Sequence, residues 1–272
     1  MPLDVMILAI LFVYGTIIGS FLNVVILRTP LKEQIVKGRS HCMSCGHTLA
    51  WYDLFPILSW ITLRGKCRYC KVSISGRYAL VELLGGVAFA LSFWTFGLTI
   101  PLAFAIVLFP VLICASFFDI DTGEIEYWCP ITIASLGVVA LTLTLMGATD
   151  TMTWYEHLIG AVIVSVPFAV LAFFGAMGGA DVQLMAASGL LLGWNIVPAA
   201  FIGIFLGAIV GVFIKIFRNP TPQKVYEGEE ETAHDVKGTV MRFGPCLSVG
   251  IGVSYLYGEQ IIEWYLKLMR FA

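Results

Sequence analysis

Between Arg77 and Lys215 the chain has no lysine or arginine, and most of that stretch is made of long apolar runs. A charged side chain at the centre of a bilayer costs at least roughly 2.5–3.5 kcal/mol, so such a stretch is typical of segments that cross a membrane. The composition agrees: the mean hydropathy is +0.90 and only 12% of residues are charged, against about 25% in soluble proteins. The sequence therefore predicts an all-α polytopic membrane protein. The net charge of −2 and the lack of a basic tail give no indication of nucleic-acid binding.

Eight apolar segments are candidates for membrane-spanning helices. A helix rises 1.5 Å per residue, so about 20 residues cross the hydrocarbon core. The predicted spans are Val5–Leu27, Ala79–Gly97, Pro101–Phe118, Cys129–Met146, Leu158–Ala176, Val182–Trp194, Val197–Phe217 and Leu247–Leu266. The sixth is short and either tilts or continues through Asn195 into the seventh. No small-residue cleavage site follows the first run, so we interpret it as a permanent span and not as a signal peptide.

The polar segment 28–77 fixes the expected orientation. It holds nine of the sixteen Lys and Arg residues against two acids, Glu33 and Asp53. Short loops this basic remain in the cytoplasm, which predicts an N-terminus outside. The predicted division is a first helix at 1–27, a cytoplasmic loop at 28–77 and a membrane-embedded domain at 78–272. Alternating the sides places the ends of the third and fifth spans at the cytoplasmic face.

Carboxylates stand at both of these span ends. Asp181 follows a run of small residues, Gly178-Gly179-Ala180, and Asp119-Ile-Asp121 ends the third span. Asp121 and Asp181 are separated by two crossings, so they lie on the same side of the membrane at similar depth. Asp119 and Asp121 point to different helix faces, so only one of them faces Asp181.

Two carboxylates that share a site cannot both ionise easily. One then activates water while the protonated one polarises a carbonyl, as in aspartic proteases. The bare glycines before Asp181 let a substrate strand approach closely. The alternative is that these are interfacial acids at helix ends, a reading that suits Asp119 best, as a helix cap or supporting residue.

The cytoplasmic loop carries two C-x-x-C knuckles, Cys42-Met-Ser-Cys45 and Cys67-Arg-Tyr-Cys70. Four thiolates in this spacing favour a closed tetrahedral structural zinc site. The alternatives are two disulfides, which a cytoplasmic location disfavours, or four free thiols. A loop of about 50 residues buries little core of its own, which is a further reason to expect a metal.

Several motifs together resemble one family, the bacterial type IV prepilin peptidases, or leader peptidase/N-methyltransferases. They are Gly19-Ser-Phe-Leu-Asn23 with Arg28, His41-Cys42-Met-Ser-Cys45-Gly-His, Trp51-Tyr-Asp53 with Pro56, Arg64-Gly-Lys-Cys67-Arg-Tyr-Cys70, Ile74-Ser-Gly-Arg77-Tyr, Val81-Glu82-Leu and Phe243-Gly-Pro-Cys-Leu-Ser-Val-Gly250. The likeness covers nearly the whole chain, and the combination is far more specific than any one motif.

The resemblance implies an enzyme of the bacterial inner membrane that cleaves the basic leader of prepilins and pseudopilins after a glycine. It implies N-methylation of the new N-terminal residue with S-adenosylmethionine. The family's catalytic aspartates map onto Asp121 and Asp181, and its zinc ligands onto Cys42, Cys45, Cys67 and Cys70. Ala180 and Gln183 stand where the family usually has Gly and Lys, and Gln183 removes a cation near Asp181.

Some roles stay open at this stage. Gly65 and Lys66 are candidates for the methylation site, or else form a knuckle turn with a solvated lysine. Glu82 pairs with a loop cation or contacts the substrate leader. The acidic run Glu227–Glu231 either attracts the basic leader or is a solvated loop. Alternative functions are a peptidase without methyltransferase activity and, far behind, a transporter that uses intramembrane acids.

Overall fold

The computed structural model describes residues 2–36, 38–148, 152–175, 177–217 and 242–271. The regular elements in these ranges are all helices, joined by turns and two isolated β-bridges in the loop, so the predicted all-α class is confirmed. The long helices are α1 (Pro2–Arg28), α3 (Arg77–Phe96), α4 (Ile100–Thr122), α5 (Trp128–Leu145), α8 (Gly179–Leu192), α9 (Ile196–Phe217) and α10 (Gly244–Phe271). Shorter ones are η1 (Trp51–Leu54), α2 (Leu58–Thr62), α6 (Trp154–Ile163), α7 (Ser165–Phe173) and η2 (Gly193–Asn195). The acidic run Glu227–Glu231 lies outside the described residues.

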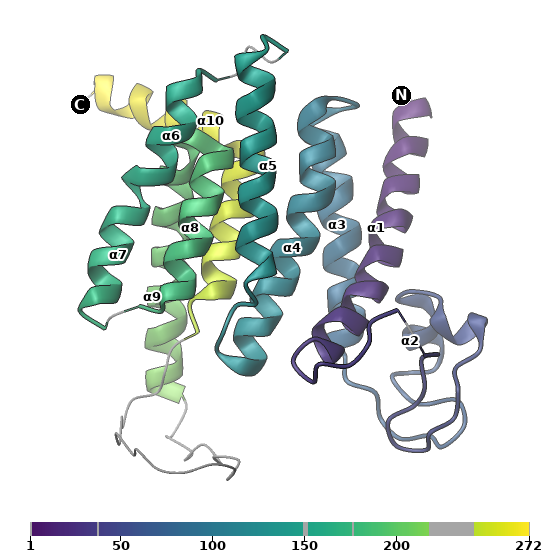
Figure 1. Ribbon diagram of the computed structural model, residues 1–272. Helices are drawn as coiled ribbons and strands as arrows, with labels where there is room; N and C mark the ends of the chain where they lie inside the picture. The colour runs from purple at the N-terminus through teal and green to yellow at the C-terminus, as the bar shows by residue number, and fades with distance from the viewer. Residues whose placement is uncertain (1, 37, 149–151, 176, 218–241, 272) are drawn as a thin grey trace.

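Six helical stretches in the described residues are long and apolar enough to cross a membrane. They are α1, α3, α4, α5, the pair α6–α7 and the continuous stretch from α8 to α9. Gly193 interrupts that last stretch with a φ of 56°. In Figure 1, α1 begins and α10 ends at the upper end of the molecule, which is consistent with an even number of crossings. The count of eight stays a prediction.

The chain reverses at η2, as contacts between α9 and α10 indicate. A side chain on Gly207 would meet Phe243 at the start of α10, and one on Gly258, much later in α10, would meet Asn195 in η2. The two helices are therefore antiparallel, and α9 runs from the upper end of Figure 1 back to the end where α8 begins. This reversal brings the first turn of α8 and the first turn of α10 to the same end of the bundle.

Small residues allow several of these helices to touch backbone to backbone. A Cβ on Gly85 of α3 would collide with the carbonyl of Gly15 in α1, and a Cβ on Gly189 of α8 with that of Gly160 in α6. Close approach at small residues is the usual way in which helices associate in a membrane, where the hydrophobic effect no longer drives them together. The α1–α3 pair stands beside α4, and the remaining helices form the larger part of the bundle (Figure 1).

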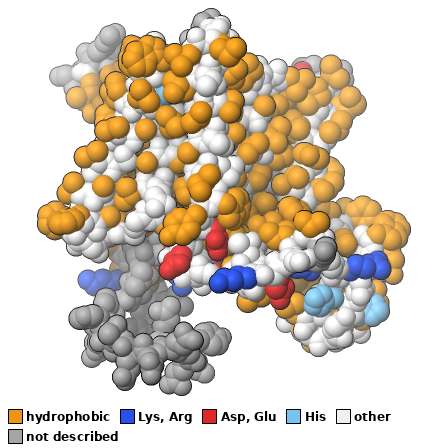
Figure 2. Space-filling model, viewed as in Figure 1, with side chains coloured by type: hydrophobic (Ala, Val, Ile, Leu, Met, Phe, Trp, Pro, Cys, Tyr) orange, Lys and Arg blue, Asp and Glu red, His pale blue; other side chains and the backbone are white. Residues whose placement is uncertain are grey.

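Most of the charged side chains in the view of Figure 2 lie at one end of the bundle. The upper part of this face is mostly apolar, while acidic and basic side chains gather along the lower edge, where α4 ends and the loop begins. The interior behind it is packed with large apolar side chains, including the fully buried Phe89, Phe118, Leu184 and Met185. A broad apolar surface above a charged rim suits a protein embedded in a bilayer.

Candidate active site and metal centre

Among the described residues, Asp119 and Asp181 are the two buried acids, and both lie at the charged end of the bundle. Asp119 lies in the last turn of α4, whose end is fixed by Gly123 in the left-handed conformation and by its N–H bond to the Asp119 carbonyl. Asp181 lies in the first turn of α8, after the N-cap residue Gly178. The two residues are only 7% and 8% exposed, and they interact electrostatically with each other.

The first turn of α10 completes this site. The backbone N–H of Gly244 donates a hydrogen bond of 2.8 Å to Oδ2 of Asp119. A Cβ on Gly244 would lie 2.8–3.0 Å from three atoms of the Asp119 side chain, so only glycine fits there without a shift. Three helices distant in sequence, α4, α8 and α10, therefore meet around the pair.

Asp121 is held elsewhere, by the guanidinium of Arg77. Arg77 donates from Nη1 and Nη2 to the two oxygens of Asp121, at 2.6 and 2.5 Å, and both side chains remain about one-third exposed. Residues two apart on an α-helix are separated by about 200° around the axis, so Asp119 and Asp121 face opposite directions. The structure thus brings Asp119 to Asp181 and turns Asp121 away. The resemblance had assigned the catalytic role to Asp121 and a supporting role to Asp119; the geometry favours the opposite assignment.

The small residues before Asp181 leave its approach open. A Cβ on Gly179 would have no neighbour within 4 Å, and one on Gly178 would only touch the Asp181 carboxylate, at 3.6 Å. Ala180 packs against the core, and Gln183 is exposed on the helix surface. This openness agrees with the expectation that a substrate backbone approaches here.

The four cysteines of the loop converge, as their spacing predicted. The Sγ atoms of Cys42, Cys45, Cys67 and Cys70 all lie within 4.8 Å of one another, and those of Cys42 and Cys70 are 3.9 Å apart. A disulfide needs about 2.05 Å, whereas sulfurs around a tetrahedral zinc with Zn–S distances of about 2.3 Å are about 3.8 Å apart. All four are free cysteines, and the cluster has the size and ligand set of a metal centre.

Electrostatics favour a thiolate at Cys42 and oppose one at Cys70. Hydrogen bonds from the backbone N–H groups of Cys45 and Ser44 lower the pKa of Cys42 to about 6. At Cys70 the Val72 backbone N–H favours the thiolate, but burial and the neighbouring thiols raise the pKa to about 11. Four thiols this close compete for negative charge, and a divalent cation relieves that competition.

The loop around the cluster is stabilised by polar contacts. Asp53 accepts from Arg68 Nε at 2.6 Å, from the Tyr69 hydroxyl and from the Ala50 backbone N–H. Although partial burial opposes its charged form, these bonds hold the pKa of Asp53 below its ordinary value. The loop thus contains an internal ion pair, Asp53–Arg68, in addition to the four-cysteine cluster.

The two candidate cofactor residues sit in the second knuckle. Gly65 has a φ of 66°, and a Cβ there would lie 3.0 Å from the Trp60 ring, so turn geometry alone accounts for the glycine. Lys66 is exposed. A role of either residue in methylation stays a prediction.

Glu82 joins the loop to the bundle in a way that the sequence did not indicate. Its Oε2 accepts a 2.7 Å hydrogen bond from the backbone N–H of Ile57, the residue that precedes α2. In the described part of the loop, its partner is therefore a backbone amide. Asn23 of α1 instead joins two helices: its side-chain amide donates to the Tyr78 carbonyl in the first turn of α3, at 3.1 Å.

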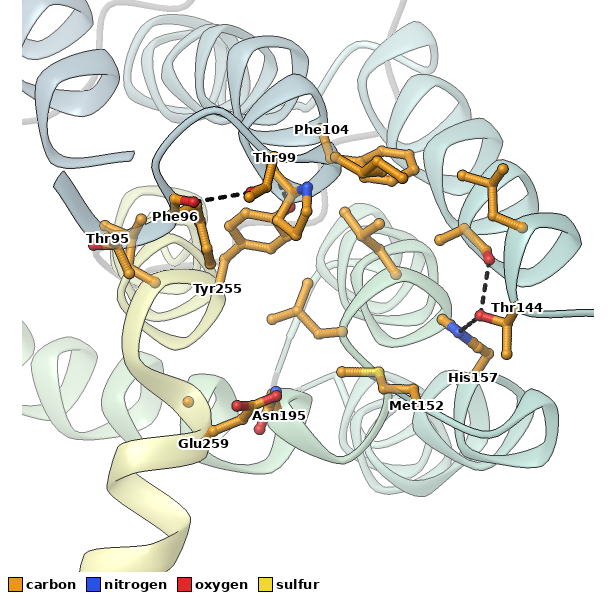
Figure 3. Close-up of a pocket in the computed structure, with 18 of the residues that line it drawn as sticks. Thr95, Phe96, Thr99, Phe104, Thr144, Met152, His157, Asn195, Tyr255 and Glu259 are labelled. Atoms are coloured by element: carbon orange, nitrogen blue, oxygen red, sulfur yellow. Dashed lines mark hydrogen bonds between the residues drawn. The ribbon is translucent and has the colours of Figure 1, made fainter. Parts of the chain in front are cut away.

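A pocket of about 680 Å³, shown in Figure 3, lies beside the start of α4 and η2, at the end of the bundle away from Asp119 and Asp181. Its wall carries Tyr255, whose hydroxyl donates to the Pro101 carbonyl, and buried His157, whose ring nitrogens lie 2.9 Å from the Leu190 carbonyl and 3.3 Å from the Thr144 hydroxyl. These polar groups are already hydrogen-bonded within the protein. Among the described residues that line it, Glu259 is the one carboxylate.

The class of protein follows from these features: a helical membrane protein with two buried interacting carboxylates at one end and a four-cysteine loop beside them. Residues 13–96 match the bacterial peptidase A24 N-terminal domain, and residues 106–212 match the type IV leader peptidase family. The chain belongs to the type IV leader peptidase family.

Relatives in that family carry the name prepilin leader peptidase/N-methyltransferase. The protein from Myxococcus xanthus is 36% identical over 245 residues, which cover 85% of this chain and 70% of that protein. The Bacillus subtilis protein is 33% identical over 96% of this chain and 98% of its own length. The Stutzerimonas stutzeri protein is 28% identical over 95% of this chain. No solved structure matches the chain.

Proposed function

We propose that this protein is a membrane aspartic endopeptidase that removes the basic leader of type IV prepilins and pseudopilins and then N-methylates the new N-terminal residue. Family membership and the names of full-length relatives support both activities. The single observation that carries the peptidase reaction is the buried pair Asp119–Asp181, contributed by α4 and α8.

The pair supplies the two proton transfers that peptide hydrolysis needs. One carboxylate is ionised and takes a proton from water, whose oxygen attacks the scissile carbonyl carbon. The other is protonated and gives its proton to the carbonyl oxygen. The tetrahedral gem-diol then collapses: the C–N bond breaks, and the amine nitrogen leaves with the proton that the first carboxylate had taken. One hydroxyl of the gem-diol returns its proton to the second carboxylate as the new carboxyl group forms, which restores the pair. The Gly244 N–H holds one oxygen of Asp119 and so fixes the orientation of that carboxylate throughout.

Two bound groups complete the proposal. Zinc at Cys42, Cys45, Cys67 and Cys70 fastens the two knuckles together, a structural role that leaves no open coordination position. S-adenosylmethionine supplies the methyl group for the second reaction. Gly65 and Lys66 are the candidate residues for that step.

We place the site at the cytoplasmic face of the bacterial inner membrane. The loop 28–77 is the most basic segment of the chain, and short basic loops remain in the cytoplasm. The lower edge of Figure 2, where the charged side chains gather, then faces the cytoplasm. A prepilin has a basic leader ahead of an apolar helix, so its cleavage point would reach the pair from that same interface.

Cleavage of a purified prepilin in detergent tests the assignment. Asp119→Asn and Asp181→Asn should each abolish cleavage, by at least about a thousandfold, because neither carboxylate can replace the other. Asp121→Asn should retain measurable cleavage. If Asp121→Asn is inert and Asp119→Asn is active, the assignment implied by the family resemblance is correct and ours is wrong. Mass spectrometry of the product N-terminus tests the methyl transfer in the same samples.

A further inference from the structure

Arg77 contacts the catalytic helix at two points that flank Asp119 in sequence. Its guanidinium binds both oxygens of Asp121, and its Cζ lies 4.7 Å from the centroid of the Phe117 ring. Phe117 and Asp121 are four residues apart and so lie one above the other on one helix face. Asp119, midway between them, points the other way.

This placement fixes the rotation of α4 about its own axis. If the last turn of α4 rotated, Asp119 would leave Asp181 and the Gly244 N–H, and Asp121 would move toward them. A guanidinium gripping a carboxylate at two oxygens is a directional contact, unlike a single lysine ammonium. The second contact, between the guanidinium and the Phe117 ring, restrains the same face of α4 one helical turn away.

Helix stability alone does not explain the charges. Arg77 is the first residue of α3 and Asp121 is the last but one of α4. A cation at a helix N-terminus and an anion at a C-terminus both oppose the helix dipole. The ion pair offsets the unfavourable interaction of each charge with its own helix dipole. We therefore interpret Arg77 and Asp121 as residues that hold α3 and α4 together at this point.

Arg77 is also the point at which the four-cysteine loop enters the bundle. The second knuckle is hydrogen-bonded to the residues that immediately precede Arg77. The Cys67 N–H donates to the Val72 carbonyl at 2.8 Å, and the Ile74 N–H donates to the Gly65 carbonyl at 2.7 Å. The Trp60 indole donates to the Ile74 carbonyl, and Arg77 N–H to the Ser75 hydroxyl. The folded knuckle therefore determines where the first residue of α3 stands.

We propose that Arg77, through Asp121 and Phe117, is a positioning residue that sets Asp119 against Asp181 and couples the fold of the four-cysteine loop to peptide cleavage. The inference rests on the proposed function, because it takes Asp119 and Asp181 as the catalytic pair. It gives Asp121 a role in the active site without contact with the substrate.

A double-mutant cycle on the full-length protein tests this coupling. Arg77→Ala and Asp121→Asn should each lower kcat for prepilin cleavage by about 100-fold, the scale of a roughly 1 Å misplacement, with little change in KM. The double variant should be no slower than the slower single variant, because the two residues act through one contact. Arg77→Lys should recover part of kcat, and the exchanged pair Arg77→Asp with Asp121→Arg more of it. Arg39→Ala, an exposed arginine of the same loop, is the matched control and should behave as wild type.

Thermal unfolding and metal content of the same samples separate positioning from folding. Equal melting temperatures and one metal per chain, together with a lower kcat, support the proposal. Wild-type kcat in Arg77→Ala, or additive losses in the double variant, would overturn it. Asp119→Asn belongs in the same series: if it still cleaves, the proposed pair itself fails, whereas an inert Asp119→Asn beside a fully active Arg77→Ala refutes the coupling alone.

Discussion

The backbone N–H of Gly244 donates to Oδ2 of Asp119 across 125 positions of sequence, at a distance of 2.8 Å. This one bond joins the end of α4 to the start of α10. It also requires a bare Cα at position 244, because a methyl group there would stand 2.8–3.0 Å from the Asp119 side chain. The glycine in the motif Phe243-Gly-Pro is therefore part of the geometry of the proposed active site.

Gly244→Ala should slow cleavage sharply while the protein still folds. The added methyl forces Asp119 or the first turn of α10 to move, and a catalytic carboxylate displaced by a fraction of an ångström loses about 10- to 100-fold in kcat. Steady-state cleavage of a prepilin measures the loss. Gly76→Ala is the control, since its Cβ would only touch the Trp60 ring, at 3.5 Å. An unchanged kcat in Gly244→Ala would mean that α10 can accommodate the methyl group without displacing Asp119, which would contradict this prediction.

Much of this site follows from sequence, and the limits are physical. The knuckle spacing was enough to predict the four-cysteine cluster, because two residues between cysteines bring their thiols to one side of a tight turn. The same-side placement of the acids followed from counting two crossings between them. Helix periodicity showed that Asp119 and Asp121 face apart, but not which one faces inward. That choice depends on how α4 is rotated, which contacts with distant Arg77 and Gly244 determine.

Other features could not have been predicted from local pattern. Glu82 has a backbone amide as its loop partner, and no side-chain pairing rule indicates such a bond. The reversal between α8 and α9 rests on Gly193 and on the packing of α9 against α10. In the sequence this region is one long apolar stretch, and hydropathy alone does not distinguish a tilted sixth span from one that is continuous with the seventh.

Removal of any loop cysteine should abolish stoichiometric metal binding. The protein should purify with about one zinc per chain, and Cys67→Ser should lose it, because Cys67 is the buried member of the cluster and three thiolates leave the site incomplete. Elemental analysis of purified protein gives the ratio. Cys246→Ser, which changes a buried cysteine outside the cluster, should keep its zinc. Wild-type protein that carries no metal after purification without chelators would contradict the proposed zinc site. Four free thiols would then be the remaining interpretation of the cluster.

The packing of α1 on α3 should tolerate no side chain at Gly85. A Cβ there would collide with the Gly15 carbonyl, a backbone atom that cannot rotate away. Overpacking of this kind costs about 1–3 kcal/mol, which exceeds or offsets the roughly 1 kcal/mol that alanine gains over glycine in a helix. Gly85→Ala should therefore lower the melting temperature in detergent, and a leucine at this position should prevent folding. Val87→Leu adds a methylene on the exposed side of the same helix and should leave the melting temperature unchanged. A Gly85→Ala protein more stable than wild type would show that α1 and α3 separate without cost. Their close contact would then not be what holds the first helix to the rest of the bundle.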